Sequence, residues 1–109
     1  ITGSVNQQGR AQVIGGATYK VEGFHRACRD RGRLTGKQGV VLPRANAINL
    51  VLRDEIADTV AAGRFHIWPV DSIDEAAVLF TGLEAEVLYD KVAARLAEFD
   101  RILTERSRL

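Results

Sequence analysis

The sequence contains almost no cysteine and no stretch suited to a membrane or to secretion. Cys28 is its single cysteine, which excludes a disulfide framework within the chain and makes a reducing compartment, the cytoplasm, the expected location. No apolar run approaches the length of a bilayer span, and no signal peptide is visible. We therefore expect no membrane segment in this chain.

An excess of charge of either sign is missing too. Fifteen basic residues stand against fourteen acidic ones, which gives a net charge of +1. Such a balance argues against a basic nucleic-acid surface or an acidic tail, so we expect no nucleic-acid partner through this segment. His25 and His66 have no cysteine or carboxylate at metal-ligand spacing. We expect no metal site, and structural or surface roles for both histidines.

Apolar material is what the chain does have, at 46% of its 109 residues. That amount suits one small domain or part of a larger one. The chain opens with Ile1 in strand-like sequence instead of methionine. We interpret it as a segment of a longer polypeptide and expect part of any active site to be missing.

The first third of the sequence predicts two strands and a helix. Residues 1–14 carry apolar positions on both sides of a turn-like stretch at 6–9. A helix is expected over 17–31, stopped by Gly32. Cys28 is expected in this helix as a small core hydrophobe and not as a nucleophile. One apolar stripe at helical spacing supports the helix: Ala17, Val21, Phe24 and Cys28.

The middle of the sequence predicts alternating strands and helices. A strand buried on both faces is expected at 39–42, and a second strand, with Trp68 in the core, at 65–70. A helix is expected over 47–62, and another from Asp71 or Ser72 to Phe80. This alternation favours a parallel strand pair in an α/β fold with layered helices and sheet. Residues on one side of the 47–62 helix would be Ile48, Leu52, Ile56 and Val60.

The C-terminal stretch, residues 84–106, has no glycine or proline and predicts an amphipathic helix. This helix would dock on its own domain or on a neighbouring subunit, and the sequence leaves both open. We therefore expect a domain portion at 1–82 and a helical segment at 83–109. The apolar positions of the helix are Leu88, Val92, Leu96, Phe99 and Leu103.

Lys20 follows the glycine pair Gly15 and Gly16 on what reads as the first turn of a helix. A cation is unfavourable there, because the first turn carries the positive end of the helix dipole. Partial burial would add to this effect and favour the neutral amine, which can act as a general base. Spacing alone favours the alternative that Lys20 points into solvent.

A longer run around these residues has a family resemblance. Ile1-Thr2-Gly3, Gly9 and the run from Ile14 through Gly15-Gly16-Ala17-Thr18-Tyr19-Lys20 to Phe24 resemble the C-terminal half of the proteolytic domain of Lon proteases, closest to the LonB-like branch. The resemblance continues through 36–43, Ala45-Asn46 and 63–68, and covers residues 1 to about 82 in order. It is therefore more specific than a glycine pair alone.

The resemblance implies a Ser–Lys dyad. Lys20 takes the place of the lysine that ends the Gly-Gly-x-x-Glu-Lys motif, and its implied role is general base. Thr2 matches a threonine whose hydroxyl contacts that amine; without the resemblance it reads as an ordinary strand threonine. Gly15 and Gly16 form the loop at the site. The implied parent is an ATP-dependent serine endopeptidase that degrades unfolded proteins as a hexameric ring, with ATP and Mg²⁺ in an attached AAA+ module.

Two departures from the family pattern qualify this reading. Tyr19 stands where the motif usually has glutamate. The nucleophile is also missing, since none of the serines has the family context, and the chain alone is expected to be inactive. The alternative is a non-catalytic module of the same fold, used for assembly or nucleic-acid binding. The serines of the chain are Ser4, Ser72 and Ser107.

Overall fold

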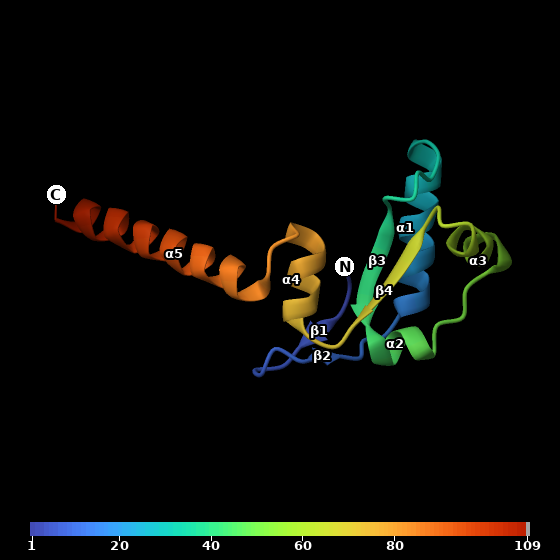
Figure 1. Ribbon diagram of the computed structural model, residues 1–109, viewed down its shortest axis with the longest axis horizontal. Helices are drawn as coiled ribbons and strands as arrows, with labels where there is room; N and C mark the ends of the chain where they lie inside the picture. The colour runs from blue at the N-terminus through green and yellow to red at the C-terminus, as the bar shows by residue number, and fades with distance from the viewer. Residues whose placement is uncertain (109) are drawn as a thin grey trace. The chain divides into compact units, whose positions relative to one another are not determined.

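A computed structural model describes residues 1–108 of the chain (Figure 1). Position 109, the last of the predicted segment 83–109, lies outside the described residues. The chain divides into two compact units, unit 1 (Ile1–Ile73) and unit 2 (Asp74–Leu109). The predicted boundary at 82–83 falls later than this division, after the helix at 73–81.

Unit 1 opens with a short antiparallel hairpin. Strand β1 (Ser4–Val5) pairs with β2 (Ala11–Gln12). The side-chain oxygen of Asn6 accepts hydrogen bonds from the backbone N–H groups of Gln8 and Arg10, both at 2.9 Å, which closes the turn. The predicted strand pair is therefore confirmed, although each strand is much shorter than the sequence suggests.

Helix α1 (Ala17–Arg31) has the predicted bounds. It begins after Gly16, whose φ of 70° is left-handed and is adopted readily by glycine. Its buried residues include Val21 and His25, whereas Phe24 stays 46% exposed. The prediction that Phe24 lies on the buried stripe is wrong. The buried stripe runs instead from Val21 to His25, four residues later, because the His25 ring packs against Phe65 and hydrogen-bonds to Thr59.

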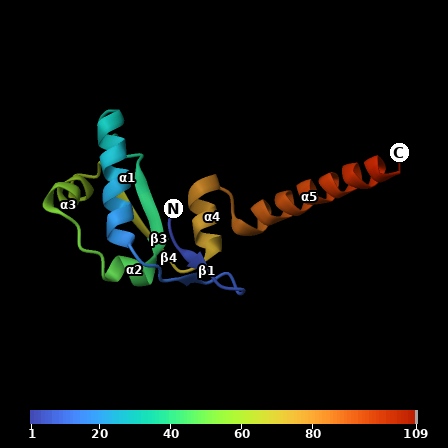
Figure 2. The ribbon, with the colours of Figure 1, turned by 180° about the vertical axis from the view of Figure 1, so that it is seen from behind.

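A parallel strand pair forms the centre of unit 1. Strand β3 (Gly39–Pro43) pairs with β4 (His66–Val70), with Gly39 opposite His66 and Pro43 opposite Val70. Helix α1 runs along one face of this pair, as Figures 1 and 2 both show. The predicted parallel pair in a layered α/β fold is confirmed. Residues of β3 that are buried, as expected of a strand covered on both faces, are Val40, Val41, Leu42 and Pro43.

The predicted single helix over 47–62 is wrong. The connection between the strands holds two helices, α2 (Arg44–Ile48) and α3 (Asp54–Ala61), separated by residues 49–53. Leu50 and Leu52 pack against the core while Val51 is 76% exposed, an alternation of period two that suits extended backbone. The chain gains more by burying both leucines than by continuing α2.

The core of unit 1 forms around Phe65, which has no exposed surface. The centroid of its ring lies 4.9 Å from the centroid of the His25 ring, and the two rings meet edge to face. Cys28 is half-buried against this cluster, as expected of a small hydrophobe. Trp68 was expected in the core but is only partly buried, and it stacks on His66 with ring centroids 5.1 Å apart. The buried members of the cluster are Val21, Leu34, Val40 and Phe65.

Gly39, at the start of β3, is held close to β4. A Cβ atom at this position would lie 2.5 Å from both the Trp68 ring and the His66 carbonyl oxygen. Real side chains essentially never approach that closely, so this position opposite His66 and against the Trp68 ring accommodates glycine alone.

Unit 2 consists of two helices, α4 (Ile73–Thr81, from Asp74 onward) and α5 (Ala85–Ser107), close to the predicted bounds. The Tyr89 hydroxyl donates a hydrogen bond of 2.6 Å to the Asp74 carboxylate and so links the two helices. No residue of α5 is buried. Among residues 1–108, no helix is both long and apolar enough to cross a membrane.

Candidate functional site

Lys20 lies in the first turn of α1, as its position after the glycine pair predicted. Its backbone N–H donates to the Gly16 carbonyl oxygen at 3.1 Å, and the first turn contains no acidic residue. Its side chain is exposed. The partial burial that was one ground for expecting a neutral amine is therefore not supplied by residues 1–108.

Thr2 is held in place by the central strand pair. Its backbone N–H donates to the Val41 carbonyl oxygen at 3.0 Å, which places Thr2 beside β3. Thr2 and Lys20 line the same open pocket of about 380 Å³. The structure thus brings together the two residues that the resemblance pairs; a direct contact between hydroxyl and amine stays a prediction. The other lining residues are apolar: Ile1, Phe24 and Val40.

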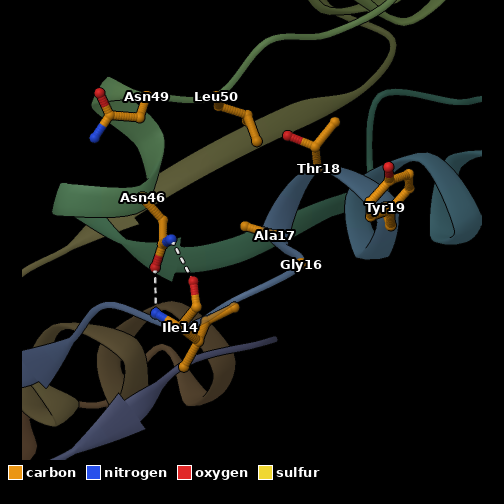
Figure 3. A pocket seen from close by; sticks show the side chains of 8 residues that line it. All are labelled: Ile14, Gly16, Ala17, Thr18, Tyr19, Asn46, Asn49 and Leu50. Carbon is orange, nitrogen blue, oxygen red and sulfur yellow. Dashed lines mark hydrogen bonds between the residues drawn. The ribbon is translucent and has the colours of Figure 1, made fainter.

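Asn46 fixes the backbone that leads into the glycine pair (Figure 3). Its side-chain NH₂ donates to the Ile14 carbonyl oxygen at 2.8 Å, and its side-chain oxygen accepts from the Ile14 N–H at 2.9 Å. One amide group therefore bonds both backbone groups of Ile14 as a neighbouring strand would. The residue before Gly15 is tied to α2 in this way, and the start of α1 with it. Sequence reasoning missed this role, and its only signal was Asn46 within the family run.

Tyr19 lies at a second pocket, of about 260 Å³, which Gly16 also lines. Figure 3 shows it with Thr18, Asn46 and Leu50 around this space. Tyr19 is 80% exposed and is not among the residues that line the Lys20 pocket. Tyr19, which stands where the motif usually has glutamate, therefore lines this pocket and not the one that Thr2 and Lys20 share.

The three serines of the chain each make contacts of their own. The Ser4 hydroxyl donates to the Gln12 side chain at 3.1 Å in the hairpin, and the Ser107 hydroxyl donates to the Leu103 carbonyl oxygen in α5. Ser72 forms an isolated bridge with Arg10. Within unit 1, neither Ser4 nor Ser72 lines the pocket of Thr2 and Lys20.

Known proteins match the greater part of the chain. A "Putative Lon protease homolog" of Escherichia coli (strain K12) is 49% identical over 83 residues, which are 76% of this chain and 14% of that protein. The protein of the same name from Haemophilus influenzae is 44% identical over 82 residues, which are 75% of this chain and 14% of that protein. A "Lon protease" of Chloroflexus aurantiacus is 39% identical over 75 residues, 69% of this chain and 8% of that protein.

The chain belongs to the Lon family. No family model matches it. The resemblance of the sequence to Lon is thereby confirmed, and the mixed α/β structure is compatible with the fold of a Lon proteolytic domain. This Lon segment spans 14% of the length of the first two relatives.

The two histidines of the Lon segment have structural partners. His25 is buried, and its Nε2–H donates to the Thr59 hydroxyl at 3.0 Å, since that hydroxyl itself donates to the Ile56 carbonyl oxygen at 2.7 Å. His66 Nε2–H donates to the Gly36 carbonyl oxygen at 2.7 Å. Within residues 1–108, no three His, Cys, Asp or Glu side chains are grouped so that they could hold a metal ion.

His25 should make the stability of the Lon segment depend on pH. Burial lowers the pKa of His25; Glu55 opposes this shift in part, and Arg29 and Arg64 add to it. The unfolded chain therefore binds a proton more readily, and the free energy of unfolding should fall as the pH drops through about 6.5 towards the lowered pKa. Urea unfolding measured between about pH 8 and pH 5 checks this.

The matched variant is His25→Gln, which removes the titrating group. Its free energy of unfolding should vary less over the same pH range than that of the unaltered chain. Equal pH dependence of the two proteins would show that the acid sensitivity arises from other groups.

Proposed function

We propose that this Lon-family chain is the C-terminal part of the peptidase domain of an ATP-dependent serine endopeptidase, in which Lys20 is the general base of a Ser–Lys dyad. The observation that carries the proposal is the shared pocket of Thr2 and Lys20, formed by residues from the N-terminal segment, α1 and β3. The names of the relatives support a protease, and the position of Lys20 in the motif supports its role.

The chemistry follows from a neutral Lys20 amine. The amine takes the proton from a serine hydroxyl, the oxygen attacks the peptide carbonyl, and the ammonium returns a proton to the leaving amine. The Thr2 hydroxyl holds the amine in position. The serine is supplied by a segment of the parent outside this sequence, so the chain alone is inactive.

The pocket walls fit such an arrangement. Ile1, Phe24 and Val40 surround Lys20 with apolar groups on an otherwise open side of the domain. A serine-bearing segment laid over this pocket would exclude water from the amine and thereby favour its neutral form. Lys20 is exposed in this chain, and the serine-bearing segment would bury it in the parent.

The remaining parts of the function belong to the parent protein. ATP and Mg²⁺ are bound in an attached AAA+ module, whose hydrolysis cycle feeds unfolded proteins to the site. The parent is a cytoplasmic hexameric ring. The AAA+ module, the hexameric ring and the cytoplasmic location are implied by the resemblance to Lon, and they form part of the same proposal as the peptidase activity.

Thr2→Val in the full-length parent tests the proposed site. Loss of a hydrogen bond that positions the amine should lower kcat for peptide hydrolysis roughly 10- to 100-fold, the range for hydrogen bonds to charged or reacting groups. Thr2→Ser keeps the hydroxyl and should retain most of the activity. If Thr2→Val were as active as Thr2→Ser, the hydroxyl would have no part in the reaction.

A non-catalytic Lon-fold module is the second candidate, and the observation that favours it is Tyr19. This residue replaces the motif glutamate and is 80% exposed, as a residue at a binding surface would be. The parental sequence before Ile1 separates the two candidates. A serine flanked by small residues and glycine in that sequence would support the protease. The absence of such a serine would support the binding module.

A further inference from the structure

Helix α5 presents apolar side chains to water along most of its length. Every described residue from 90 to 108 is exposed, so α4 leaves this face without cover within unit 2. Contiguous exposed apolar surface on a protein usually marks a site of interaction. We call four residues of this face the α5 stripe: Val92 (45% exposed), Leu96 (59%), Phe99 (45%) and Leu103 (62%).

The spacing of the α5 stripe indicates the shape of its partner. With Tyr89, which precedes it, the apolar positions recur at intervals of three, four, three and four residues. This is a heptad repeat, in which Tyr89, Leu96 and Leu103 occupy a positions and Val92 and Phe99 occupy d positions. A period of 3.5 keeps the apolar seam against a second helix that runs alongside at a small angle. Arg106, at the next d position, ends the seam.

The charges beside the seam favour a second copy of α5 in parallel orientation. Arg95 is at a g position and Asp100 at the following e position. In a parallel, in-register pair, g of one helix faces e of the other, so Arg95 of each copy meets Asp100 of the next. In the antiparallel pair that aligns a with d, Arg95 would face Ile102 and Asp100 would face Ala93. Charge complementarity exists in the parallel arrangement alone.

Arg95 already lies along the seam in the single chain. Its guanidinium carbon is 4.8 Å from the centre of the Phe99 ring, and its Nη1 is 2.7 Å from the Glu98 carboxylate. A long basic side chain that covers the edge of an apolar seam is the usual flank of a coiled coil. The N-terminal part of α5 is held to α4 through Tyr89 and Asp74, which leaves the residues after Tyr89 for a partner.

We propose that α5 associates with α5 of further copies of this chain in a parallel coiled coil. Leucine at a, at Leu96 and Leu103, with β-branched Val92 at d favours bundles of more than two helices. Leu88 and Ile102 at g widen the apolar face, which suits contact with two neighbours at once. Each copy contributes the same surface, so the bundle closes on itself by rotational symmetry. This association is independent of the peptidase proposal.

Sedimentation equilibrium of the whole chain, from low micromolar to near-millimolar concentration, tests the association. The mass should rise above that of a monomer as the concentration increases. Leu96→Glu should raise the dissociation constant at least about a hundredfold, because it places an unpaired carboxylate in the seam. Ala94→Glu, on the opposite face of α5, is the matched control and should associate as the unaltered chain does.

Both variants change exposed positions, so their helix content should match that of the unaltered chain by circular dichroism. A monomer at every concentration would overturn the proposal and show that the α5 stripe docks on its own chain or stays free. Equal weakening by Leu96→Glu and Ala94→Glu would overturn it as well.

A charge exchange tests the parallel orientation. Arg95→Glu places like charges opposite each other and should weaken association, and Arg95→Glu combined with Asp100→Arg should restore it. Both proteins lose the pair between Arg95 and Glu98, so that loss cannot account for the difference. Association that remains equally weak in the double variant would exclude the parallel pairing of these residues.

Discussion

Lys20→Arg in the full-length parent should reduce peptide-bond hydrolysis by at least about a thousandfold, the order expected when the base of a nucleophilic pair is removed. Arginine keeps the positive charge and nearly the length of lysine, but it stays protonated and cannot accept a proton. The exposed position of Lys20 in the first turn of α1 tolerates the longer side chain, so the fold should be unaffected. Hydrolysis of an unfolded protein measures the loss.

The control for this variant is the same substitution at another exposed lysine of unit 1, Lys37→Arg, which should leave hydrolysis unchanged. ATP hydrolysis by the parent should also persist in Lys20→Arg, because the change lies outside the nucleotide-binding module. Full peptidase activity of Lys20→Arg would refute the dyad assignment.

Phe65→Ala should lower the free energy of unfolding of unit 1 by about 3–5 kcal/mol, the range for removing a buried phenylalanine side chain. Phe65 has no exposed surface, and its ring contacts those of His25 and Phe24, so its removal leaves a cavity between α1 and the strand pair. A loss of this size is comparable with the whole stability of a small domain. Guanidinium unfolding followed by circular dichroism measures it.

Phe80→Ala deletes the same side chain at a position in α4 that is 61% exposed. Its effect on the free energy of unfolding should stay within about 0.5 kcal/mol, as for most surface substitutions. If Phe65→Ala had an effect as small as that of Phe80→Ala, the cluster around Phe65 would not be the main source of stability in unit 1.

The elements that sequence reasoning predicted correctly are those with local signals. The bounds of α1 follow from Gly16 and Gly32, and the strand pair follows from two short apolar runs separated by a connection long enough for a crossover. The error over 47–62 arose because apolar residues spaced by four also fit an extended segment that buries Leu50 and Leu52. Which period applies depends on what the segment packs against, and this is a property of the fold.

The site shows the same limit. Lys20 and Thr2 could be named from the resemblance, but their shared pocket depends on β3, which lies beside both. Asn46 could not be found, because its role requires Ile14, which is distant in the sequence. The sequence did not predict that His25 is buried beside the more apolar Phe24, because the burial depends on its contacts with Thr59 and Phe65, which are distant in the sequence.

Gly39 affects the register in which β3 pairs with β4. A parallel pair can in principle form in several registers, and a shift by two residues keeps every side chain on its proper face. Such a shift would bring Val41 to the place that Gly39 occupies, where a Cβ would meet the Trp68 ring. This shift of β3 on β4 is therefore opposed by steric conflict. The missing side chain of Gly39 favours the observed alignment over it, and Thr2, bonded to Val41, is positioned by that alignment.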